Sequence, residues 1–167
     1  ERVTRDTVYL GERRPSVISM HPDLVVIESF AYNPFPFEQG ALDQHWLSLA
    51  YVIDAIKANI PDAKIVLAAT IAPNSHVFGD GAPGLAFSPQ DKIERTNIIK
   101  QYLQNTIRFA LSEHVPLADV YHASLDQAGE GKLLYINSGD HIHYSDAGRQ
   151  LFARTVVDTI VDNKLLE

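Results

Sequence analysis

The sequence PDLVVIE at residues 22–28 decides the fold class. Its four central residues are all apolar, without the alternation of polar and apolar positions that a half-exposed strand shows. A continuous run of this kind is typical of a strand that is buried on both faces of a parallel sheet. The sequence KIVLAA at residues 64–69 is a second such run, and residues 115–121 are expected to form a third strand.

Helical patterns alternate with these strands. Apolar residues recur near helical spacing between the first two strands, and Pro61 ends that pattern. Strands that alternate with helices predict parallel pairing and right-handed crossovers. We therefore expect one α/β domain over residues 1–167, built as a three-layer α/β/α sandwich. The expected helices cover residues 16–21, 43–59, 91–113 and 151–166, and residues 7–10 have the character of a further strand.

Composition excludes several classes of partner. The chain has 14 basic and 21 acidic residues, a net charge of −7, which disfavours binding to nucleic acid or to an anionic membrane surface. It has no cysteine, which rules out disulfides and thiolate metal sites. No apolar run approaches the ~20 residues that a membrane span needs. We expect no nucleic acid partner, no membrane span and no cofactor.

The residues with the clearest chemistry lie near the C-terminus, in the sequence GDHIHYSDAG at residues 139–148. An aspartate three residues before a histidine can accept a hydrogen bond from the ring, which fixes the tautomer and leaves the other nitrogen as a general base. Asp140 and His143 have this spacing. Ser145 is expected to cap the last helix, with Asp146 in its first turn. The alternative is a polar helix cap with surface histidines.

Two loops are expected at the edge of the sheet where ligands bind in open α/β folds. Residues 28–37 follow the first strand, and their aromatic side chains and two prolines can form either an apolar wall or a plug for the sheet edge. Residues 76–89 are rich in glycine and proline. They are expected to be either a flap over the same edge or a surface insertion without function.

Residues 140–148 resemble the C-terminal Asp-x-x-His block of the SGNH (GDSL-like) hydrolases, and residues 22–33 resemble the strand-and-Asn block of that family. The resemblance implies a flavodoxin-like fold and hydrolysis of esters by a serine nucleophile. In that mechanism His143 deprotonates the serine, Asp140 orients His143, and Asn33 donates a hydrogen bond to the oxyanion. Small acyl esters or acetylated carbohydrates are the expected substrates.

The nucleophile of that family lies in an N-terminal Gly-Asp-Ser motif, and this sequence contains no Gly-Asp-Ser. The first sixteen residues are too few for the strand, loop and helix that would carry it. We expect that one or more N-terminal strands are missing or come from another chain, or that residues 7–10 fill the vacancy. The chain by itself is expected to be inactive and to self-associate through an open sheet edge. Ser75, at the end of the second strand, is the best placed of the candidate serines, which also include Ser16, Ser19 and Ser29.

Two other classes of function remain open. A non-catalytic relative of the hydrolases would bind acylated or sugar ligands in the same cleft. A metal site is the second alternative, with ligands from Asp140, His141, His143 and His122. Alternate residues of an extended segment point in opposite directions, which argues against convergence of His141 and His143 on one ion.

Overall fold

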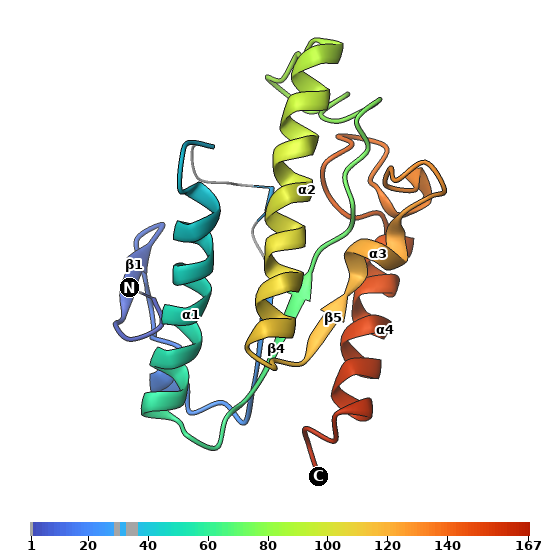
Figure 1. Ribbon diagram of the computed structural model, residues 1–167. Coiled ribbons are helices and arrows are strands. Elements are labelled where there is room, and N and C mark those ends of the chain that lie inside the picture. The colour runs from blue at the N-terminus through green and yellow to red at the C-terminus, as the bar shows by residue number, and fades with distance from the viewer. Residues whose placement is uncertain (1, 29–30, 33–36) are drawn as a thin grey trace.

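A parallel sheet forms the middle layer of the molecule (Figure 1). The computed structural model describes residues 2–28, 31–32 and 37–167. In this part of the chain three parallel strands lie side by side in the order β3-β4-β5. They are β3 (Leu24–Glu28), β4 (Lys64–Ala69) and β5 (Leu117–Asp119).

Helices cover both faces of this sheet, which confirms the three-layer α/β/α prediction (Figure 1). Helices α1 (Ala41–Asn59) and α2 (Pro89–Ser112) pack on one face, where their apolar side chains meet Ile65 and Leu67 of β4. Helix α4 (Asp146–Asp162) packs on the other face against Val66, Ala68 and Ala118. None of the helices in the described part of the chain has the length and apolar character that a membrane span requires.

The two apolar runs of the sequence, which form β3 and β4, have different environments. In β4, Val66, Leu67, Ala68 and Ala69 are each 0% exposed, as expected for a strand enclosed on both faces. In β3, whose Val26 pairs with Val66, the side chain of Val26 is 40% exposed. Among the described residues β3 pairs only with β4, so it is an edge strand, and the prediction of full burial is wrong there.

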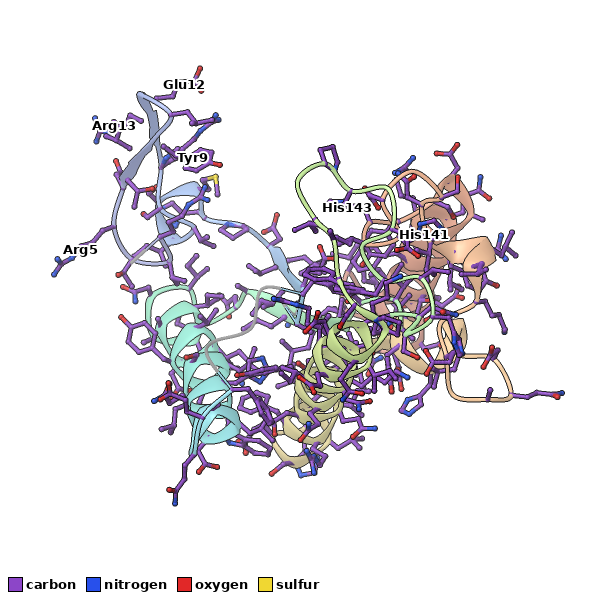
Figure 2. All side chains as sticks on the ribbon, turned by 90° about the horizontal axis from the view of Figure 1, so that it is seen from above. Arg5, Tyr9, Glu12, Arg13, His141 and His143 are labelled. Carbon is purple, nitrogen blue, oxygen red and sulfur yellow. The ribbon has the colours of Figure 1, made fainter. Side chains whose placement is uncertain are left out.

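The N-terminal residues form a separate hairpin. Strands β1 (Thr7–Tyr9) and β2 (Glu12–Arg14) pair antiparallel, and the two residues between them have positive φ, as a type I′ turn requires. Figure 2 shows Tyr9, Glu12 and Arg13 on this hairpin, which stands away from the body of the molecule. The strand expected at residues 7–10 therefore forms over Thr7–Tyr9, but it does not pair with the main sheet.

Several element boundaries differ from those expected. Strand β5 ends at Asp119, and Val120–Ser124 forms the short helix α3, because the Asp119 side chain accepts a hydrogen bond from the His122 N–H and caps that turn. Single 3-10 turns occupy Ile18–Met20 (η1), where a short helix was expected, and Leu133–Tyr135 (η2). Helix α4 begins at Asp146, with Ser145 as its N-cap, as the sequence predicts.

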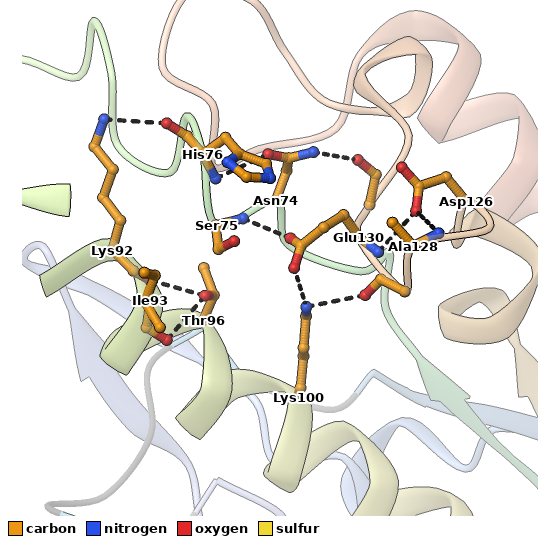
Figure 3. A network of polar contacts seen from close by, with 12 residues as sticks. Asn74, Ser75, His76, Lys92, Ile93, Thr96, Lys100, Asp126, Ala128 and Glu130 are labelled. Carbon is orange, nitrogen blue, oxygen red and sulfur yellow. Dashed lines mark hydrogen bonds and ion pairs between the residues drawn. The ribbon is translucent and has the colours of Figure 1, made fainter. Parts of the chain in front are cut away.

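A polar network joins the loop after β4 to the loop after α3 (Figure 3). Lys100 of α2 donates to Glu130 Oε1 at 2.7 Å, and the Ser75 N–H donates to Glu130 Oε2 at 2.7 Å. Asn74 Nδ2 donates to the Gly131 carbonyl. Burial alone would raise the pKa of Glu130, but the hydrogen bonds from Lys100 and Ser75 and the charge of Lys100 outweigh it and lower the pKa below 4.5. Glu130 is therefore ionised at neutral pH.

Replacement of Glu130 by glutamine is expected to lower the free energy of unfolding by about 1–3 kcal/mol at neutral pH, since hydrogen bonds to a charged group are lost. A carboxylate whose pKa is depressed by folding stabilises the protein above its unfolded pKa and loses that contribution as the pH falls through the folded value. Urea unfolding should therefore show the difference between E130Q and the parent shrinking below pH 4.5. The exposed Glu94→Gln on α2 is the control, and an equal loss in E94Q would contradict the assignment.

Gly148 lets the start of α4 pack against the 3-10 turn at η2. A Cβ at this position would lie 2.2 Å from the Tyr135 carbonyl oxygen. Alanine is the better helix former by about 1 kcal/mol, so propensity alone favours Gly148→Ala. Overpacking against backbone costs about 1–3 kcal/mol, and we expect it to dominate. Urea unfolding of G148A should show a net loss of stability, while the exposed Gln150→Ala changes it little; a more stable G148A would refute the contact.

Candidate active site

Asp140 and His143 form the hydrogen-bonded pair that their spacing predicts. His143 Nδ1 lies 2.8 Å from Asp140 Oδ2, while the backbone N–H groups of Ile142 and His143 donate to Asp140 Oδ1 at 2.8 and 3.0 Å. A carboxylate can only accept, so Nδ1 carries the proton and the neutral ring keeps a lone pair on Nε2. The side chain of His143 is 75% exposed, which leaves Nε2 accessible to a reactant.

Asp140 is held in its ionised form. Partial burial would raise the pKa of this carboxyl, but the hydrogen bonds from the two backbone N–H groups and from the His143 ring outweigh burial and lower it below 3.8. The orientation of His143 by a carboxylate is therefore available at neutral pH and is lost only as the pH falls through that depressed value.

A cavity of about 480 Å³ opens beside His143, within the usual size range of small-molecule sites. Its walls are mainly aromatic and aliphatic: the Tyr32 and Phe78 ring centroids are 6.2 Å apart, and those of Phe78 and Phe87 are 6.0 Å apart. The Arg95 guanidinium lies 4.4 Å from the centroid of the Phe87 ring. The lining residues are Glu28, Tyr32, Thr70, Ile71, Phe78, Leu85, Phe87, Arg95, Ile142, His143 and Tyr144.

The end of β3 is joined to the His143 loop by a side-chain hydrogen bond. The Tyr144 hydroxyl donates to Glu28 Oε1 at 2.8 Å. Burial raises the pKa of Tyr144, and the hydrogen bond to Glu28 adds to the effect. The sequence analysis did not assign either residue to the site. An acidic residue at the carboxyl end of an apolar strand is the signal that would have indicated Glu28.

The excursion at residues 76–89 supplies one wall of the cavity. Phe78 is 6% exposed, and Phe78, Leu85 and Phe87 all line the cavity. This segment therefore covers the carboxyl edge of the sheet, which agrees with the flap interpretation. In the loop that follows β3, Tyr32 also lines the cavity. Phe37 packs elsewhere: its ring centroid lies 6.0 Å from that of Tyr102.

The expected oxyanion donor, Asn33, lies outside the described residues, as do Ser29, Phe30 and Phe35. No described residue that lines the cavity is a serine. Ser75, the best placed candidate in the sequence, is absent from the cavity lining, and its N–H donates to Glu130. Thr70 lines the cavity, and its Oγ1 is buried without a hydrogen-bond partner.

The other histidines of the metal hypothesis have separate partners. His141 Nδ1 lies 2.7 Å from the Asp80 carbonyl oxygen, and His122 Nδ1 lies 2.6 Å from Asp119 Oδ2. Within the described ranges no group of three or more histidine, aspartate or glutamate side chains is arranged to hold a metal ion. Asp119 and His122 thus form a second Asp-x-x-His pair, which is not among the residues that line the cavity.

Comparison of the whole fold with solved structures identifies its type. A GDSL-like lipase from Bacteroides thetaiotaomicron superposes with a TM-score of 0.64 at 18% sequence identity, covering 89% of this chain and 66% of the lipase. The chain has the SGNH (GDSL-like) hydrolase fold. A catalytic mutant of an acetylxylan esterase from Geobacillus stearothermophilus is also similar, with a TM-score of 0.53 and 19% identity over 87% of this chain and 62% of the esterase.

The chain thus spans about two thirds of the length of these SGNH-fold proteins. No protein-family model matches the sequence. No curated protein sequence matches it either.

Replacement of Asp140 by asparagine should alter the tautomer of His143, because the amide no longer requires a proton on Nδ1. Ring ¹⁵N chemical shifts in alkaline solution, where imidazole is neutral, should show the proton on Nδ1 in the parent and a mixture of tautomers in D140N. The matched variant is Asp119→Asn in the second pair, which should change His122 and leave His143 as it was. An unchanged His143 in D140N would contradict the geometry.

Proposed function

We propose that this chain carries the acid–base part of a serine ester hydrolase, with Asp140 and His143 as its catalytic pair. The observation that supports it most directly is the cavity of about 480 Å³ beside an accessible, carboxylate-oriented imidazole. Further support is that His143 lines a cavity at the carboxyl edge of the sheet, where open α/β proteins bind ligands.

In the proposed reaction, His143 Nε2 accepts the proton of a serine hydroxyl as that oxygen attacks the ester carbonyl carbon. The imidazolium then gives the proton to the departing alkoxide, which leaves as the alcohol. Water repeats the sequence on the acyl-enzyme and releases the carboxylic acid. Asp140 stays ionised throughout and stabilises the imidazolium. Asn33 donates to the oxyanion, a contribution of roughly 3 kcal/mol for one such donor.

The nucleophile is proposed to come from outside residues 1–167, on a strand that pairs with the free edge of β3. Support comes from the position of β3 at the edge of the sheet among the described residues, and from Glu28, which ends β3 inside the cavity. A parallel strand added beside β3 would bring its carboxyl end to the same edge as His143. In this proposal residues 1–167 are one incomplete domain, and two copies associate through β3 when the added strand is absent.

The proposed substrates are small acyl esters or acetylated carbohydrates. The Tyr32, Phe78 and Phe87 rings offer apolar faces on which either an acyl group or the C–H face of a sugar ring can pack. The similar esterase is described as acting on acetylxylan, which agrees with the carbohydrate alternative.

A non-catalytic binding protein is the second candidate. It is favoured by one observation: no described residue lining the cavity is a serine. Such a protein would use the same cavity for acylated or sugar ligands and would have no use for an ionised Asp140.

The test compares variants of the two Asp-x-x-His pairs, Asp140–His143 and Asp119–His122. A fluorophosphonate probe, followed by intact mass and peptide mapping, should label one serine in the protein that includes the added strand and none in residues 1–167 alone. In the labelled protein His143→Ala should lower kcat/KM for ester hydrolysis by at least about a thousandfold. His122→Ala is the matched control and should retain activity.

Full activity in the H143A variant would refute the proposed role of His143. Absence of any adduct and of any turnover, together with saturable binding of acyl or sugar ligands, would favour the binding protein.

A further inference from the structure

The His141 side chain connects two loops by a hydrogen bond. One is the loop at residues 139–145, which carries Asp140 and His143 and is called the catalytic loop below; the other is the segment at residues 76–89, which forms one wall of the cavity. His141 Nδ1 lies 2.7 Å from the carbonyl oxygen of Asp80. A carbonyl only accepts, so the His141 ring donates this bond. The backbones of the two loops also approach each other closely beside this bond. A Cβ added to Gly81 would lie 2.4 Å from the Gly139 carbonyl oxygen. Figure 2 shows His141 and His143 next to the loop that carries residues 76–88.

His141 has an unusual backbone conformation for a residue with a side chain. Its φ is +51°, in the left-handed region where glycine is favoured and where histidine, asparagine and aspartate are the commonest exceptions. Such a conformation carries a free-energy cost that glycine would avoid. The hydrogen bond to Asp80 is a contact that glycine at this position could not make.

Asp80 is held from a second side as well. Its carboxylate forms an ion pair with Lys92 in the first turns of α2, while its carbonyl accepts from His141. The excursion is thereby fixed between α2 and the catalytic loop. Phe78 and Phe87, on either side of Asp80 in the sequence, are the stacked rings that form the cavity wall.

We propose that His141 is a positioning residue that determines substrate specificity by holding this aromatic wall at a fixed distance from His143. The inference rests on the proposed esterase function and extends it to the size of the substrate. At the roughly 30 Å³ that a water molecule takes in the liquid, the cavity of about 480 Å³ holds about 16 heavy atoms. An acetyl group, with three heavy atoms, leaves most of it empty. The group that occupies this cavity is therefore larger than acetyl and presents an apolar face to the aromatic wall, as a longer acyl chain on the acyl side or a chain or sugar ring on the alcohol side of the ester would.

The first readout needs no catalysis. The N–H groups of Asp80, Ala82 and Leu85 donate to backbone carbonyls within the wall, so their hydrogen exchange reports how firmly it is held. In residues 1–167, His141→Ala should speed exchange at these amides roughly 2- to 10-fold, as expected for loss of one hydrogen bond. His141→Asn should restore slow exchange, because asparagine tolerates positive φ and its amide N–H can replace Nδ1–H. Amides of β4 should not change.

The second readout is the hydrolysis of three esters by the protein that includes the added strand. For methyl hexanoate, with a large acyl group, or hexyl acetate, with a large alcohol, H141A should raise KM several-fold while leaving kcat nearly unchanged. Methyl acetate, which does not reach the wall, should show no change. The ester that responds identifies which side of the substrate occupies the cavity. H141N should behave as the parent, and His122→Ala serves as a histidine variant outside the cavity.

Unchanged exchange in H141A would overturn the proposal, whatever the activity. Faster exchange with equal effects on all three esters would also overturn it, because His141 would then be structural only. Absence of turnover by the parent protein would refute the proposed function, and with it the specificity role, while the exchange data would still decide the contact. If H141A does not fold, Gly81→Ala separates the same two loops by a steric clash and should give the same pattern.

Discussion

The burial of β4 between two neighbouring strands and two layers of helices is the constraint on which the rest of the structure depends. Its residues Val66 to Ala69 are fully buried, so α1 and α2 must pack on one face and α4 on the other. A strand enclosed in this way fixes the position of both neighbours through its backbone hydrogen bonds. Because all three strands are parallel, the loops that follow them meet at one edge, and the cavity beside His143 forms there.

The local geometry of an Asp-x-x-His pair does not by itself define a site. Asp119 and His122 repeat the bonds of Asp140 and His143 almost atom for atom, with the aspartate capping the turn and accepting from the ring. Of these four residues, only His143 lines the cavity. The difference arises from long-range contacts, which bring Glu28, Ile71 and Phe78 to His143 from three separate parts of the chain.

The half-buried edge strand connects the fold to the proposed division of the active site. An exposed strand edge carries backbone N–H and C=O groups that can pair with another strand. In β3 this edge ends at Glu28, in the cavity and hydrogen-bonded to Tyr144. The geometry of the sheet alone would therefore bring the end of a segment that pairs with β3 close to the Asp140–His143 pair.

The sequence by itself determined the layers of the fold and the internal geometry of the Asp140–His143 pair. Runs such as residues 64–69 specify buried strands. The hydrogen bonds of Asp140 with His143 and of Ser145 with Gly148 each span three residues, so local spacing predicts them. Only the tertiary structure decided the separation of the hairpin from the sheet, the exposure of Val26, and the contact between His141 and Asp80. These features depend on which distant segments pack together. The apolar periodicity of a segment indicates that one of its faces is buried, but it does not indicate which segment covers that face.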